Sequence, residues 1–180
     1  MICQDLRRAM RMVCSEGGTI ASMKTIVIGL GNPILGDDGV GWVVAEEMMK
    51  QLPPDLDVDV DCLSLGGISL MERLIGYDRA ILIDALVSDY EPGSVIVSRL
   101  DELPDHASFH LTSTHDMSLQ NAMKLGRQMG AKLPQDLTVI GISAKHIYDF
   151  REELSMPVQE AVPKAAQLVR EILMQNITIL

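Results

Sequence analysis

The sequence has few cysteines, few basic residues and no long apolar run, and each shortage excludes a class of protein. Only three of its 180 residues are cysteine, without a C-x-x-C pair, so we expect neither a zinc knuckle nor a disulfide framework. Fifteen basic residues stand against 25 acidic ones, without a local basic patch, which argues against a nucleic-acid partner. No run approaches the roughly 20 apolar residues that span a bilayer. We therefore expect no membrane insertion and a reducing, cytoplasmic compartment.

The chain is long enough for one substantial core, because 47% of its residues are hydrophobic and no linker or low-complexity run divides it. The first 22 residues contain adjacent arginines, Arg7 and Arg8, but no apolar stretch long enough for the centre of a signal peptide. Met23 stands directly before an apolar run. We expect residues 1–22 to be an N-terminal extension, with Met23 as an alternative native start, and residues 23–180 to form one domain.

The stretch TIVIGLGNPILGDDGVG predicts a buried strand, a tight turn, an acidic pair and the start of a helix. Its first six residues are apolar and rich in β-branched side chains, typical of a strand that is covered on both faces. Asp37 and Asp38 follow at the N-terminal end of the helix, where the helix dipole and unpaired amides favour carboxylates. Helix capping and a role in chemistry are equally consistent with Asp37. We expect Asp38 to be the residue that does chemistry.

Strand and helix patterns alternate along the rest of the chain. Helices are expected over about 39–52, 68–75, 117–129 and 157–173, and strands over 57–65, 79–86, 94–100 and 137–142. The strand at 57–65 alternates apolar residues with aspartate, which indicates an edge strand with one solvated face. Pro163 interrupts the last helical pattern, so that helix either begins near Ala161 or kinks at the proline. The alternation predicts a single α/β domain of three layers, α/β/α, with a mostly parallel twisted sheet.

Three polar side chains stand where strands meet helices. Asp38 follows the first strand, Asp84 ends the apolar run in RAILIDAL, and His115 precedes a helix in HLTSTHD. A buried aspartate is costly unless it is paired, hydrogen-bonded or bound to metal, and a cap or a pair with Arg79 is the structural alternative for Asp84. Because ligands of parallel sheets bind beyond the carboxyl ends of the strands, we expect the three to meet there. Two carboxylates and an imidazole suit zinc, nickel or iron.

The segments GNPILGDDGVG, IDAL and STHD, in this order, resemble the hydrogenase maturation proteases, which are endopeptidases that trim the large subunit of nickel-iron hydrogenases. The similarity covers about residues 24–173. It implies that Asp38, Asp84 and His115 form the metal site of that family. It also implies removal of a C-terminal peptide from the large-subunit precursor, the expected partner, after nickel insertion. We expect a monomer, because such a protein meets its partner transiently.

The resemblance leaves open which group activates water. Asp38 is the candidate base, as in an aspartyl-type endopeptidase, and polarisation of the peptide carbonyl by nickel is the alternative. The resemblance implies a ligand role for Asp84 and His115. The nickel is expected to be carried by the substrate, and no organic cofactor is expected. Three further residues are candidates for orienting the metal-site side chains, with turn and cap roles as alternatives: Asn32, Asp37 and Asp116.

Three other functions fit parts of the sequence. GLGNPI begins like the G-x-G-x-x-G of dinucleotide-binding folds, but Ile34 replaces the third glycine and two acids follow where a pyrophosphate would lie. The same strand resembles that of the peptidyl-tRNA hydrolases, but their T-R-H-N segment is missing and the acidic charge disfavours tRNA. A metal-sensing or docking module, which binds a nickel protein without cutting it, would need the same three polar residues as the protease.

Overall fold

A five-stranded sheet forms the centre of the molecule. The computed structural model describes residues 23–53, 56–103, 117–145, 147 and 149–175. The strands are β1 (Thr25–Leu30), β2 (Val58–Leu63), β3 (Arg79–Leu86), β4 (Val95–Arg99) and β5 (Asp136–Ser143), in the spatial order β2-β1-β3-β5-β4. All neighbouring pairs are parallel except β4 with β5, which is antiparallel. The predicted mostly parallel sheet is confirmed.

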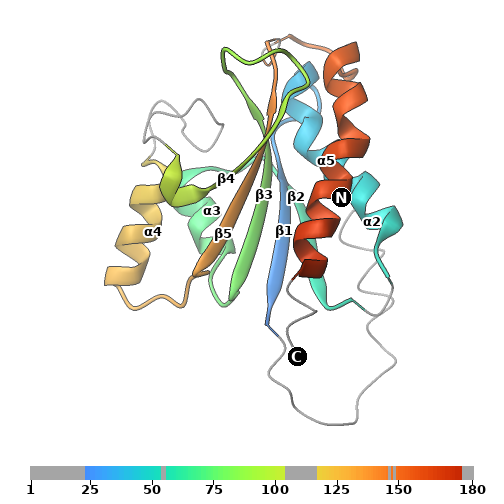
Figure 1. Cartoon of the computed structure of the whole chain (residues 1–180). Coiled ribbons are helices and arrows are strands. Elements are labelled where there is room, and N and C mark those ends of the chain that lie inside the picture. Colours follow the sequence, from blue (N-terminus) through green and yellow to red (C-terminus); the bar gives the residue numbers. More distant parts are fainter. Residues whose placement is uncertain (1–22, 54–55, 104–116, 146, 148, 176–180) are drawn as a thin grey trace.

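Helices cover both faces of this sheet (Figure 1). They are α2 (Val40–Gln51), α3 (Gly67–Arg73), α4 (Leu119–Gln128) and α5 (Met156–Gln175). One apolar core lies between the sheet and α2 with α5, and a second lies between the sheet and α3 with α4. This is the expected three-layer α/β/α arrangement. None of the helices in the described ranges is both long and apolar enough to cross a bilayer.

β1 and β3 lie at the centre of the sheet and are buried along their whole lengths. Because successive side chains of a strand point to opposite faces, Ile26 enters the core under α3 and α4, whereas Val27 enters the core under α2 and α5. Arg79 begins β3 and forms an ion pair with Asp136, Nε to Oδ2 3.3 Å. Asp84 is five residues further along the strand, roughly 16 Å away. Two side chains cannot reach across that distance, so Arg79 is not the ion-pair partner of Asp84.

β2 is an edge strand, as predicted, but its acidic face is only partly solvated. Asp61 is only 5% exposed and accepts a hydrogen bond from Arg73 Nε at 2.6 Å. The hydroxyl of Tyr77 donates to Asp59 Oδ2 at 2.8 Å. These hydrogen bonds offset the desolvation of the two carboxylates under α3 and the residues after it. The expectation of a solvated face is therefore wrong at Asp61, whereas Asp59 is half-buried and Asp57, directly before the strand, is exposed.

α5 is continuous from Met156 to Gln175 and contains Pro163 in its interior. The alternative start near Ala161 is therefore wrong. A proline inside a helix removes one main-chain hydrogen bond, and packing of the apolar face of α5 against α2 and β5 compensates for that loss. The earlier start matters for function, because it places Ser155 directly before the helix, at the end of the connection that crosses from β5 to α5 at the top of Figure 1.

Candidate active site

The turn after β1 folds back over its own strand. Gly31 has a φ angle of +119°, and a Cβ atom there would lie 1.8 Å from the main-chain oxygen of Asp38. Only glycine permits both this backbone angle and this close approach. The hydroxyl of Ser64 donates to Gly31 O at 2.6 Å, which ties the turn to the end of β2. Asp38 is thereby held against the carboxyl end of β1.

A single 3₁₀ turn, η2 (Gly36–Gly39), carries both acids of the pair and leads directly into α2. Gly41, in the first turn of α2, packs against two strands. A Cβ atom at this position would lie 2.3 Å from Leu30 O and 2.4 Å from Ile83 O. The start of α2 is therefore pressed onto the carboxyl ends of β1 and β3. Because Asp84 follows Ile83, η2 and Asp84 lie at the same edge of the sheet.

Asp38 and Asp84 are the two predicted metal-site acids within the described residues, and both are buried. Asp38 is 1% exposed and Asp84 is 0% exposed. The main-chain N–H of Asn32 donates to Asp38 Oδ2 at 2.6 Å, a charge-assisted hydrogen bond that fixes the orientation of the carboxylate. Asp84 pairs in register with Gly141 of β5. Buried acids at the ligand-binding edge of an α/β sheet mark a candidate active site.

Asp37 joins the acidic turn to the start of α5. It is 1% exposed, its Oδ1 accepts from the main-chain N–H of Ser155 at 2.6 Å, and its Oδ2 accepts from the Ser155 hydroxyl at 2.8 Å. The guanidinium of Arg151 lies 3.7 Å from Oδ1. Neither η2 nor α2 begins with a side-chain cap. The capping alternative for Asp37 in its own helix is therefore wrong, because the carboxylate binds the segment before α5 instead.

Main-chain hydrogen bonds join the same two segments. Arg151 N donates to Ile34 O at 3.2 Å and Gly36 N donates to Arg151 O at 2.6 Å. They form a parallel bridge between Leu35 and Arg151. Asp37 and Ser155 are 118 positions apart in the sequence. No local pattern signals such a contact, so sequence reasoning missed both Arg151 and Ser155.

The remaining predicted site residues divide into two groups. Asn32 has a role in the turn, because its Oδ1 accepts from the N–H of Ile34 at 3.2 Å while its own N–H binds Asp38. His115 and Asp116 lie outside the described residues, so their roles stay predictions. In the described part of the chain, no group of three or more His, Cys, Asp or Glu side chains is placed to hold a metal ion. The two acids share the expected edge, and the three-residue metal site stays a prediction.

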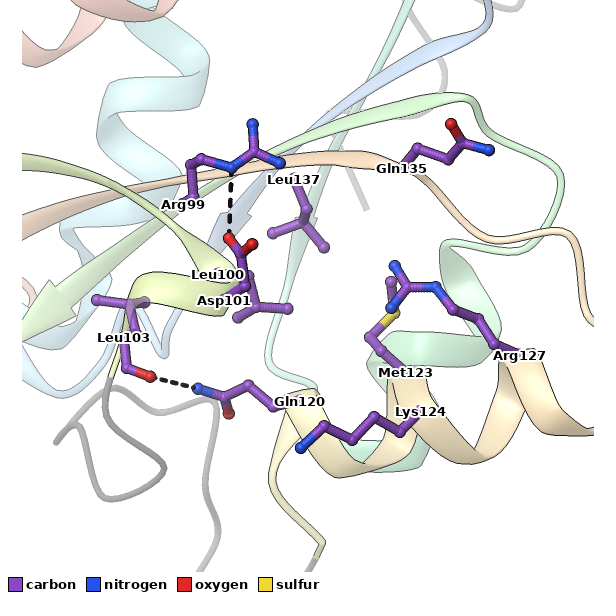
Figure 2. Close-up of a pocket in the computed structure, with 10 residues that line it drawn as sticks. All are labelled: Arg99, Leu100, Asp101, Leu103, Gln120, Met123, Lys124, Arg127, Gln135 and Leu137. Carbon is purple, nitrogen blue, oxygen red and sulfur yellow. Dashed lines mark hydrogen bonds and ion pairs between the residues drawn. The ribbon is translucent and has the colours of Figure 1, made fainter.

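A separate hollow of about 500 Å³ lies between α4, the start of β5 and the turn after β4 (Figure 2). Its lining includes three cationic side chains: Arg99, Lys124 and Arg127. Leu137, which also lines it, is four residues before Gly141, the register partner of Asp84. That separation corresponds to roughly 13 Å along the strand. The hollow is therefore distinct from the acidic edge.

Comparison with known proteins decides the family. The model of a family described as hydrogenase maturation protease matches residues 42–172. The chain belongs to this family. A putative hydrogenase maturation protease of Methanocaldococcus jannaschii is 30% identical over 148 residues, which cover 80% of this chain and 92% of the relative. The hydrogenase expression/formation protein HupD of Rhizobium leguminosarum is 29% identical over 152 residues, which cover 83% of this chain and 74% of HupD.

Solved structures of the family have the same fold as this maturation protease. The hydrogenase maturating endopeptidase HybD from Escherichia coli superposes with a TM-score of 0.71 at 24% identity, covering 86% of this chain and 94% of HybD. The [NiFe] hydrogenase maturation protease HybD from Thermococcus kodakarensis gives a TM-score of 0.62 at 25% identity, covering 83% and 99%. The resemblance carried by the three sequence motifs is confirmed. Membership of the family assigns the chain a peptidase role in hydrogenase maturation.

Proposed function

We propose that this maturation protease removes a C-terminal peptide from the large-subunit precursor of a nickel-iron hydrogenase after nickel has been inserted. The observation that carries the proposal is the burial of Asp38 and Asp84 at one edge of the sheet, beyond the ends of β1 and β3. Two carboxylates fit the oxygen part of a donor set that, with an imidazole, accommodates nickel. His115 is the imidazole that the sequence motif supplies.

Nickel would arrive as cargo of the substrate. The three side chains of the proposed site would contact it only when the precursor presents it. A precursor without nickel would then lack the contact that places its scissile bond at the protease. Because positioning of the reacting groups contributes much of the rate of such reactions, processing would depend on completed nickel insertion.

Asp38 is the proposed general base. The N–H of Asn32 holds its Oδ2 at 2.6 Å, so the carboxylate has a fixed orientation. During hydrolysis it would accept a proton from water while the water oxygen attacks the peptide carbonyl carbon. The C–N bond then breaks, the leaving nitrogen takes up the proton as an amine, and the other product ends in a carboxylate. Asp84 is assigned as a ligand for the nickel of the substrate.

Mass spectrometry of the precursor tests this function. Nickel-loaded and nickel-free precursors are incubated with the wild type, with Asp38→Asn and with Asp136→Asn, which changes an acid at the opposite end of the sheet. We expect the loaded precursor alone to lose a C-terminal peptide, and only with the wild type and Asp136→Asn. Equal trimming of the nickel-free precursor would overturn the nickel requirement. Binding without any cleavage would favour the docking module over the peptidase.

A further inference from the structure

Three exposed apolar side chains lie on the two segments that meet at the acidic turn. Ile34 is 49% exposed, Phe150 is 86% exposed and Met156 is 71% exposed. Isolated exposed apolar residues are common on protein surfaces. Neighbouring apolar side chains that stay exposed in the folded protein indicate a surface that another molecule covers. We call these three residues the apolar rim.

Hydrogen bonds to the acidic turn hold the apolar rim together. The N–H of Arg151 donates to the carbonyl of Ile34 at 3.2 Å, so Phe150 lies one residue from a direct main-chain contact with that turn. Met156 directly follows Ser155, whose N–H and hydroxyl bind the Asp37 carboxylate. The apolar rim therefore has a fixed position relative to the turn that carries Asp38.

We propose that the apolar rim is the docking surface for an apolar segment of the hydrogenase large-subunit precursor next to its scissile bond. This inference rests on the proposed function. The apolar rim adjoins the acidic turn, and this position identifies the substrate as the molecule that covers it. A peptide whose carbonyl group reaches Asp38 also passes over the residues that are hydrogen-bonded to that turn. A second copy of this chain seated on the same rim would cover the acidic edge and exclude the substrate.

Steady-state processing of the nickel-loaded precursor tests the docking surface. The variants are Phe150→Ser, Phe150→Leu and the matched control Met129→Ser. Met129 is 78% exposed and directly follows α4, whose end leads into the amino end of β5 (Figure 1). We expect Phe150→Ser to raise KM about tenfold with kcat within about twofold, because it removes uniform binding at one anchor residue. Phe150→Leu should restore most of the affinity, and Met129→Ser should match the wild type.

Two outcomes separate failure of the docking surface from failure of the proposed function. Cleavage by Phe150→Ser and Ile34→Ser with the wild-type KM would overturn the docking surface alone. Absence of cleavage by the wild type would overturn the proposed function, and surface plasmon resonance with the same precursor then decides docking. A Kd about tenfold higher for Phe150→Ser would support the surface. An unchanged Kd, or no binding by the wild type, would refute it.

Discussion

The acids at the two ends of the sheet differ in exposure and in the groups that hold them. Near the amino ends of β1, β3 and β5, Asp78 forms an ion pair with Lys132 and Asp101 forms one with Arg99, and the side chains of these acids are 35% and 75% exposed. At the carboxyl ends, Asp37 and Asp38 are each 1% exposed, and main-chain N–H groups donate to them at 2.6 Å.

The exposed ion pairs at the amino ends are weak interactions, whereas the buried carboxylates at the carboxyl ends are held rigidly. Exposed ion pairs contribute at most about 1 kcal/mol to the free energy of unfolding, because water and salt screen them. A buried carboxylate that satisfies main-chain donors is more costly to remove, since those donors lose their partner. The same substitution should therefore have small effects at the amino ends and large effects at the carboxyl ends.

The largest contrast concerns catalysis. Asp38→Asn should lower kcat/KM for precursor processing by at least about 100-fold, because an amide cannot accept the proton of the attacking water. Asp136→Asn should change it by less than about twofold, because that acid lies at the other end of β5 from the site. Peptide release followed by mass spectrometry measures both. More than a tenth of wild-type activity in folded Asp38→Asn would contradict the role of Asp38 as base.

The second contrast compares two glycines with positive φ angles. Gly31→Ala should lower the free energy of unfolding by about 3 kcal/mol, because a methyl group there would meet the main chain of Asp38 as well as strain the backbone. Gly76→Ala, before β3, should cost about 1 kcal/mol, because its φ of +89° is strained but nothing lies within 4 Å of the added carbon. Urea unfolding measures the two values. Equal losses would show that the close approach at Gly31 is unimportant.

The third contrast compares two acids directly. Asp37→Ala should reduce the free energy of unfolding by about 2 kcal/mol, because the N–H and hydroxyl of Ser155 lose their acceptor. Asp101→Ala should cost less than about 1 kcal/mol, because Asp101 and Arg99, the two partners of its ion pair, are 75% and 50% exposed. Ser155→Ala, which keeps the N–H bond, should fall between them. Chemical denaturation at neutral pH gives all three values, and a larger loss for Asp101→Ala than for Asp37→Ala would reverse the proposed ranking.

The smallest effect is a pH dependence at the amino ends. The hydrogen bond from Lys132, followed by that from the main-chain N–H of Lys24, lowers the pKa of Asp78 below its ordinary value of 3.8. Because the folded pKa lies below the unfolded one, the pair stabilises the protein above about pH 4 and loses its effect as pH falls through the folded pKa. The difference in unfolding free energy between wild type and Asp78→Asn should therefore shrink below about pH 4. A difference that grows on acidification would contradict this assignment.

Local patterns predicted the parts of the fold that depend on neighbouring residues. The apolar run RAILIDAL predicted β3 with the bounds that the structure has, Arg79–Leu86. A glycine-rich turn followed by two acids placed Asp38 at the edge of the sheet because strand, turn and helix are consecutive there. The order of strands and helices then limited the fold to a parallel α/β architecture.

Contacts between distant segments were not predictable from those patterns. Asp37 looked like a helix cap, because its partner Ser155 belongs to a segment with no matching motif. Alternating aspartates suggested a solvated face of β2, because only the folded chain brings Arg73 to Asp61. Pro163 left open a later helix start or a kink, and tertiary packing maintains α5 on both sides of it. His115, the third predicted ligand, lies outside the described residues.

The parallel bridge between Leu35 and Arg151 also sets the order in which the site is completed. A ribosome synthesises the acidic turn long before it reaches the segment that binds this turn. Until Ser155 has emerged and folded back, Asp37 lacks the donors that fix it in the finished protein. Contacts between residues far apart in sequence form late, because the intervening chain must first be ordered. The hydrogen bonds that fix the acidic turn therefore require the chain to be synthesised through Ser155.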